Sequence, residues 1–122
     1  MPRSLLLVCE NARAAAPVAD YFGAHYLVDV ASDHATALAS LEQHHYEAAI
    51  VDVRLTDASS RDGLEIAQSV RSISPETSLV LLSSWVDETI LQSARELDVP
   101  VVTKPASLAG IEQLLGGLLS PP

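Results

Sequence analysis

The chain has 122 residues, a hydrophobic content of 48%, a formal net charge of −9 and a single cysteine. This size suits one domain over residues 1–122, able to bury about two-thirds of its unfolded surface. The negative charge argues against direct binding of nucleic acid. No apolar stretch approaches the ~18 residues of a membrane span, and the segment before the first strand is too short for a signal peptide, so we expect a cytoplasmic protein outside the membrane.

Apolar runs alternate with segments of helical period, a pattern of repeated βαβ units that predicts the α/β class. The first half of the chain predicts a strand at Leu5–Val8, a helix at Asn11–Phe22, a strand at Leu27–Ala31 and a helix at Asp33–His44. Pro17 predicts a kink in the first helix or a regular start near Ala16. Gly23 suits a left-handed cap after it, and Ser32 suits the N-cap of the second helix. The expected buried stripe of that second helix is Ala35, Leu38 and Leu41.

The second half continues the alternation. It predicts strands at Ala48–Val53, Leu79–Leu82 and Val99–Thr103, and helices at Gly63–Ile73, at Asp87–Leu97 and from Ser107 to Gly116–Gly117. The expected buried face of the middle helix is Leu64, Ile66, Ala67, Val70 and Ile73. The run at Ala48–Val53 is the strongest candidate for a central strand. Asp29 and Pro100 place their two strands at sheet edges, because an edge strand tolerates a wetter face and a missing ladder donor.

Polar side chains follow or end four of the five apolar runs. They are Glu10, Asp52, Ser83 and Lys104, the only lysine of the chain. If the strands are parallel, their carboxyl ends share one edge of the sheet, where open α/β sheets bind ligands. Two carboxylates, a hydroxyl and an ammonium group would then converge on one crevice, in which the ammonium group favours an anion.

In this order and on these elements, the motifs resemble the receiver domain of two-component response regulators over nearly the whole chain. That family carries an acidic residue after strand one, a phosphorylated aspartate at the end of strand three, a Ser or Thr after strand four and Lys-Pro after strand five. Here these are Glu10, Asp52, Ser83 and Lys104-Pro105. The resemblance implies a five-stranded parallel sheet in the order 2-1-3-4-5, with helices on both faces.

The resemblance also implies a role for each site residue. Asp52 is the phosphoacceptor, and Mg²⁺, which prefers one or two carboxylates with water and phosphate oxygens, is held by Glu10, Asp52 and the backbone carbonyl of Arg54. Ser83 and Lys104 contact the phosphoryl group, and the pocket is lined by Cys9, Ser84 and Pro105. The implied donor is a histidine kinase or phosphotransfer protein, and the implied homodimer surface is the fourth helix, fifth strand and fifth helix. No enzymatic activity is expected beyond Mg²⁺-dependent self-phosphorylation and autodephosphorylation.

Two departures from the family pattern favour a different interpretation. The family has two acidic residues after strand one, whereas this chain has Cys9 before Glu10, which predicts weak Mg²⁺ binding. Val101 stands where the family often has a switching Tyr or Phe. These departures favour a degenerate receiver that acts as a phosphorylation-independent interaction or dimerisation module. The loop after Asp52 is also longer than usual, and we derive no role for it.

A flavin-binding flavodoxin-like protein would share the strand order but has less support. It would need Ser, Thr or Gly in its phosphate loops and flanking aromatics, and the turn Glu10–Arg13 has neither. His44 and His45 have no spacing typical of metal ligands and suit a solvated helix end. Ser83 and Ser84 are both candidates for the hydroxyl, and only the expected strand register favours Ser83.

Overall fold

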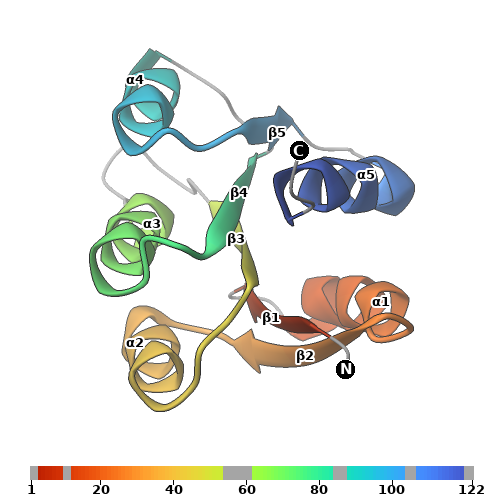
Figure 1. The fold of residues 1–122 in the computed structure, drawn as a ribbon. Coiled ribbons are helices and arrows are strands. Elements are labelled where there is room, and N and C mark those ends of the chain that lie inside the picture. The colour runs from red at the N-terminus through yellow and green to blue at the C-terminus, as the bar shows by residue number, and fades with distance from the viewer. Residues whose placement is uncertain (1–2, 10–11, 54–61, 84–87, 104–106, 120–122) are drawn as a thin grey trace.

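Strands and helices alternate in one parallel sheet with helices on both faces (Figure 1). The computed structural model describes residues 3–9, 12–53, 62–83, 88–103 and 107–119. The elements are β1 Arg3–Val8, α1 Ala12–Phe22, β2 Tyr26–Ala31, α2 His34–Gln43, β3 Ala48–Val53, α3 Asp62–Ile73, β4 Ser78–Ser83, α4 Glu88–Leu97, β5 Val101–Thr103 and α5 Leu108–Leu119. The strand order is β2-β1-β3-β4-β5, so the predicted fold class and topology are confirmed.

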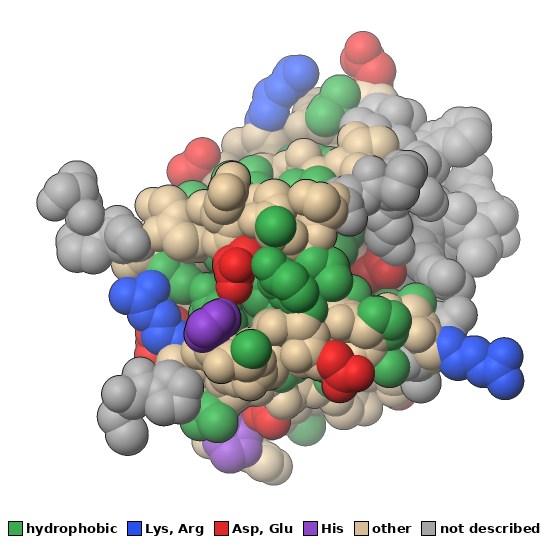
Figure 2. Space-filling view, turned by 90° about the vertical axis from the view of Figure 1, so that its right-hand side faces the viewer, with side chains coloured by type: hydrophobic (Ala, Val, Ile, Leu, Met, Phe, Trp, Pro, Cys, Tyr) green, Lys and Arg blue, Asp and Glu red, His purple; other side chains and the backbone are tan. Residues whose placement is uncertain are grey.

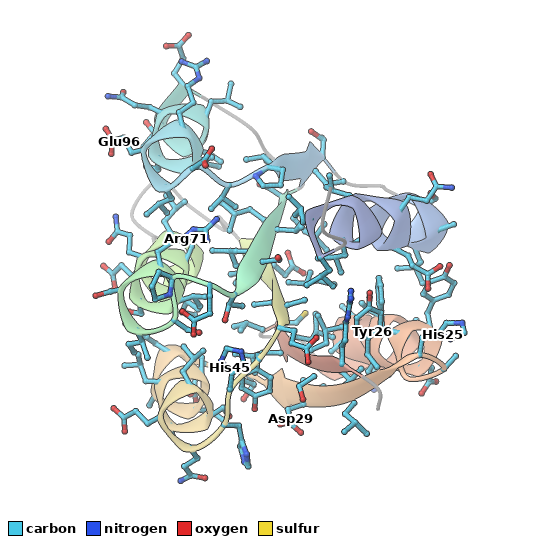
Figure 3. All side chains as sticks on the ribbon, viewed as in Figure 1. His25, Tyr26, Asp29, His45, Arg71 and Glu96 are labelled. Carbon is cyan, nitrogen blue, oxygen red and sulfur yellow. The ribbon has the colours of Figure 1, made fainter. Side chains whose placement is uncertain are left out.

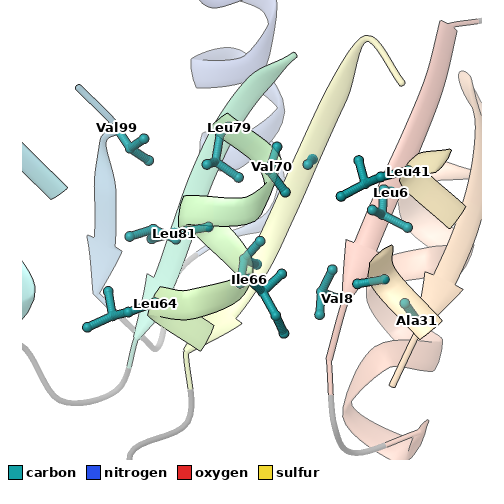
Figure 4. Packing of buried hydrophobic residues seen from close by; sticks show 14 of the residues in the cluster. Leu6, Val8, Ala31, Leu41, Leu64, Ile66, Val70, Leu79, Leu81 and Val99 are labelled. Carbon is teal, nitrogen blue, oxygen red and sulfur yellow. The ribbon is translucent and has the colours of Figure 1, made fainter. Parts of the chain in front are cut away.

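The three inner strands are covered on both faces. Figure 1 shows α1 and α5 on one face and α2, α3 and α4 on the other. From Leu5 to Val8 and from Ala48 to Val51 every side chain is buried, as continuous apolar runs in parallel sheets require. The side chains alternate between two hydrophobic cores. One, under α2 to α4, includes Leu6, Val8, Val51, Ile66, Val70 and Leu81 (Figure 4), and the other, under α1 and α5, includes Leu5, Leu7, Ile50, Phe22, Leu82 and Leu115.

Figure 2 shows the face formed by α5 and α1, where hydrophobic side chains gather in the middle of the view. In α5 the only charged residue is Glu112, which accepts a hydrogen bond from the Tyr21 hydroxyl of α1 at 3.1 Å. Among the helices that the structure describes, none has both the length and the apolar character needed to cross a bilayer.

Two helix ends differ from the sequence-based expectation. The N-cap of α2 is Asp33, not Ser32, because the helix begins one residue later; the Asp33 carboxylate accepts from the Thr36 amide at 2.7 Å, where the positive end of the helix dipole also favours it. Gly23 has no positive φ, so it is not a left-handed cap. Its amide donates to the Ala19 carbonyl at 2.8 Å, and a Cβ would lie 2.9 Å from that oxygen, so close approach is what calls for glycine.

Helix α5 continues through Gly116 and Gly117 instead of stopping there. Each helical glycine costs about 1 kcal/mol relative to alanine, whereas burying one leucine side chain contributes about 1.5–3 kcal/mol. Leu115 is fully buried and Leu119 packs on the same core, so burial on both sides of the glycine pair outweighs their cost. Helix α1 begins at Ala12 and has Pro17 inside it, so it does not begin near Ala16.

Smaller corrections concern buried faces and one strand boundary. In α2 the buried residues are Ala37 and Leu41, and Ala35 is exposed, because a stripe at a constant spacing of three drifts off the face of a 3.6-residue helix. Ile73, expected to be buried, is 43% exposed in the last turn of α3. Strand β5 begins at Val101, since Pro100 lacks an amide hydrogen; its carbonyl accepts from the Leu81 amide.

Tyr46 joins the edge strand β2 to the inner strands at the end of the sheet where strands begin. Its side chain is 2% exposed, and its hydroxyl donates to the Asp29 carboxylate at 2.5 Å. Its carbonyl accepts from the Thr77 hydroxyl, just before β4, at 2.7 Å. The pKa of Tyr46 is raised to about 12, first by burial and then by the hydrogen bond to Asp29 and the negative charge of the Asp29 carboxylate. The sequence pattern identified Asp29 as an edge residue but not this partner.

We predict that Tyr46→Phe lowers the free energy of unfolding by about 1–2 kcal/mol at pH 7, because it removes a hydrogen bond to a charged acceptor. The difference from wild type should shrink as the pH rises. The raised pKa means that the Tyr46 hydroxyl keeps its proton to a higher pH in the folded state than in the unfolded state. Its contribution to stability is therefore complete below the ordinary tyrosine pKa of about 10 and is lost as the pH rises from there to about 12.

Urea unfolding at pH 8, 10 and 11 measures both effects. Tyr21 and Tyr26 remain in both proteins, so their own titrations cancel in the comparison. A difference between wild type and variant that stays constant up to pH 11 would contradict the assigned role of the Tyr46 hydroxyl.

Candidate functional site

The structure describes three of the predicted site residues, Cys9, Asp52 and Ser83, and all three are buried at the carboxyl ends of inner strands. Strands β1 and β4 lie on either side of β3, so these residues share one edge of the sheet. The remaining predicted site residues lie outside the described residues. They are Glu10, Arg54, Ser84, Lys104 and Pro105.

Asp52 is the first polar residue of β3, after Ala48–Val51. Its side chain is only 8% exposed, although carboxylates are rarely buried without compensating interactions. Because side chains alternate along a strand, Asp52 shares the sheet face of Ile50, under α1 and α5. The fold therefore holds an acidic group at the centre of the edge, where a packed core restricts its orientation.

Cys9 is the partner that the structure places against Asp52. Val8 pairs with Val51, so Cys9, the next residue, stands level with Asp52 on the neighbouring strand. The thiol is 3% exposed and donates a hydrogen bond to Oδ2 of Asp52 across 3.4 Å. The sequence pattern predicts Cys9 only as a residue that lines the pocket in place of a carboxylate. The register of the first and third strands is the signal that predicts this direct contact.

Ser83 ends β4 opposite Val53, one position beyond the pair formed by Asp52 and Leu82. Its side chain is 1% exposed. Because side chains alternate along a strand, Ser83 belongs to the sheet face of Leu79 and Leu81, whereas Asp52 belongs to the opposite face. A ligand shared by the two residues would therefore sit beyond the strand ends, where the two faces meet.

Asp52 supplies the kind of oxygen donor that Mg²⁺ prefers, while the Cys9 sulfur is a soft donor better suited to thiophilic metals. Within the described part of the chain, no three His, Cys, Asp or Glu side chains gather closely enough to hold a metal ion. The described residues thus offer Mg²⁺ the carboxylate of Asp52, and the other predicted ligands, Glu10 and Arg54, lie outside the described residues.

The sequence model of the response regulator receiver domain matches residues 6–115. The chain belongs to this family. The receiver domain has no match among curated proteins by sequence comparison.

Solved structures share the fold of this receiver domain at low sequence identity. The Vibrio cholerae chemotaxis protein CheY4 is 21% identical with a TM-score of 0.83, over 98% of this chain and 100% of that one. The BeF3-activated DrrB receiver domain is 20% identical with a TM-score of 0.82, over 98% of each chain. A Burkholderia pseudomallei response regulator with a phosphorylated aspartic acid and a calcium ion is 21% identical with a TM-score of 0.81, over 93% of this chain and 66% of that one. At these identities the likeness establishes the fold.

Proposed function

We propose that this receiver domain accepts a phosphoryl group on Asp52 from a histidine kinase or phosphotransfer protein and then changes its contacts with protein partners. The observation that carries the proposal is the buried carboxylate of Asp52 at the end of the central strand, between β1 and β4. The phosphorylated aspartic acid named for the Burkholderia pseudomallei structure supports the same chemistry on this fold.

In the proposed transfer, a carboxylate oxygen of Asp52 attacks the phosphorus atom of a phosphohistidine. The phosphorus–nitrogen bond breaks, its electron pair stays on the imidazole, and that nitrogen takes a proton from water. The product is an aspartyl phosphate, a covalent intermediate of the kind carboxylate nucleophiles form. The packing around Asp52 holds the carboxylate in position, so little orientational freedom remains to be lost when the donor arrives.

Four other residues have proposed roles at the phosphoryl group or at its metal ion. Ser83 donates a hydrogen bond to one phosphoryl oxygen, and Lys104 pairs with the negative charge, both as charge-assisted contacts. Glu10 joins Asp52 and the Arg54 carbonyl in holding Mg²⁺, which when bound neutralises charge on the transferring group. We propose no enzymatic activity beyond Mg²⁺-dependent self-phosphorylation and autodephosphorylation.

The proposed output surface is formed by α4, β5 and α5. Leu91 on α4 is 38% exposed and Leu118 on α5 is 45% exposed, so both helices offer apolar area to a partner or to a second copy of the chain. With a net charge of −9, a protein partner fits this surface better than nucleic acid does.

A degenerate receiver remains the second candidate, and the contact between Cys9 and Asp52 is the observation that favours it. A buried thiol donating to Oδ2 supplies a hydrogen-bond partner without any metal or phosphoryl group. In that interpretation Asp52 is a structural acid, and the domain binds its partners in one constitutive state.

We predict that Asp52→Asn abolishes the gain of one phosphoryl mass that wild type shows after incubation with acetyl phosphate and Mg²⁺, measured by intact-mass spectrometry. Asparagine fills the same volume but is not a nucleophile. Asp20→Asn, which changes an exposed aspartate of α1, is the matched control and should label like wild type.

If wild type gains no mass with acetyl phosphate or a cognate kinase, and binds no beryllofluoride, the degenerate interpretation replaces the proposal. A mass gain retained in Asp52→Asn would assign the phosphoryl group to another residue.

We also predict that Cys9→Asp raises the affinity for Mg²⁺ by about ten- to a hundredfold, because a carboxylate beside a metal-binding aspartate orients metal-bound water and adds negative charge. Isothermal titration calorimetry measures the change directly. Cys9→Asn is the control, since it adds an oxygen donor without charge and should bind only slightly more tightly than wild type. Equal affinities in all three proteins would mean that Cys9 serves packing alone.

A further inference from the structure

Arg71, in the last turn of α3, fastens the end of α4 to the rest of the molecule. Its guanidinium group donates hydrogen bonds to four backbone carbonyls, those of Leu97 at 3.0 Å, Asp98 at 3.0 Å, Thr77 at 3.2 Å and Pro75 at 3.3 Å. Figure 3 shows Arg71 on the side of α3 that lies toward α4 and β4. One side chain thus joins α3, the turn before β4 and the carboxyl end of α4.

The physical reason for this arrangement is the polarity of helix ends. The last carbonyls of a helix have no partner inside the helix and carry its negative partial charge. Arg71 stands in the last turn of its own helix and reaches the carbonyls that end α4, so one cation serves two helix ends. Hydrogen bonds from a charged donor are stronger than neutral ones, and the planar guanidinium fork holds several in fixed directions.

The chain leaves α4 through a tight cap that Arg71 reinforces. Asp98 has a φ of 56°, a left-handed conformation that glycine usually takes. The Asp98 amide donates to the Arg95 carbonyl at 3.1 Å and the Val99 amide to the Ala94 carbonyl at 2.9 Å, the hydrogen-bond pattern of a Schellman motif. Val99 is buried. This end of α4 is therefore held by its backbone hydrogen bonds, by the Val99 side chain and by the guanidinium group of Arg71.

The hydrogen bonds of Arg71 reach the carboxyl end of α4, whereas the amino-terminal half of that helix is anchored in the core by Ile90. The buried residues of α4 are Ile90 and Ala94, and the first two residues, Glu88 and Thr89, are exposed. This amino-terminal end is also the one that follows Ser83 along the chain. A change beside Ser83 would therefore reach the amino-terminal end of α4 before the end that Arg71 holds.

We propose that Arg71 makes the carboxyl end of α4 a fixed pivot, so that α4 responds to phosphorylation by moving its amino-terminal half while residues 94–99 stay in place. The motion is that of a hinge at an element's end, in which a few residues hold while the attached element turns. Its consequence is that Leu91, exposed on the moving half, changes position relative to α5. The trigger rests on the proposed function, whereas the clamp itself is a property of the unphosphorylated protein.

Hydrogen exchange followed by NMR on the full chain tests the clamp without any ligand. Arg71→Gln should speed exchange of the hydrogen-bonded amides in residues 94–99 by about tenfold or more, since it removes charge-assisted hydrogen bonds, and should leave β1 amides unchanged. Arg95→Gln removes the same charge from an exposed site on α4 and should leave residues 94–99 within about twofold of wild type. Equal effects of the two variants, or a uniform rise across the sheet, would overturn the clamp.

Beryllofluoride with Mg²⁺ then tests the pivot. In wild type, exchange should change in residues 88–93 and stay within about twofold in residues 94–99, whereas in Arg71→Gln both halves should change. Equal changes in both halves of wild-type α4 overturn the pivot. If no residue of wild type responds, including Asp52 and Ser83, the proposed function fails and with it the trigger, while the ligand-free comparison still decides the clamp. If Arg71→Gln does not fold, Arg71→Lys, which keeps the charge but not the planar fork, replaces it in both comparisons.

Discussion

Strand β3 lies at the centre of the sheet with helices over both faces, so its side chains must be apolar until the strand reaches the edge. Ala48 to Val51 meet this requirement, and Asp52 is the first residue that does not. The position of the carboxylate follows from this constraint, because one residue earlier it would lie deeper in a core. Cys9, directly after β1, and Ser83, the last residue of β4, are also buried at this edge.

The polar residues at the two ends of the sheet have different roles. At the end where strands begin, Tyr46, Thr77 and Arg71 connect side chains to carboxylate and carbonyl oxygens of neighbouring elements, and this end holds β2, β4 and α4 together. At the opposite end, buried polar residues face the edge at which α/β sheets bind ligands. The hydrogen bonds of Tyr46, Thr77 and Arg71 lie at the opposite end of the sheet from Cys9, so they do not depend on which residue stands at that position.

Local sequence rules failed where packing or close contact outweighed them. The glycine pair in α5 predicts a helix end, but Leu115 and Leu119 bury on either side of it and the helix continues. Ser32 and Asp33 are both good N-cap residues by type. Asp33 is the N-cap because α2 begins at His34. Gly23 suits a left-handed cap by its type, yet the structure uses its missing side chain to approach the Ala19 carbonyl.

The sequence by itself determined the alternation of strands and helices, and with the family resemblance it predicted the strand order and the polar residues at the strand ends, since two-faced burial leaves a continuous apolar run that is visible in one dimension. It did not determine which side chains meet. The contact of Cys9 with Asp52 depends on the register of two strands that lie 43 residues apart, and the reach of Arg71 to Leu97 spans 26 residues. Such pairs carry no local signal, because their geometry exists only after both cores have formed and brought the strands and helix ends together.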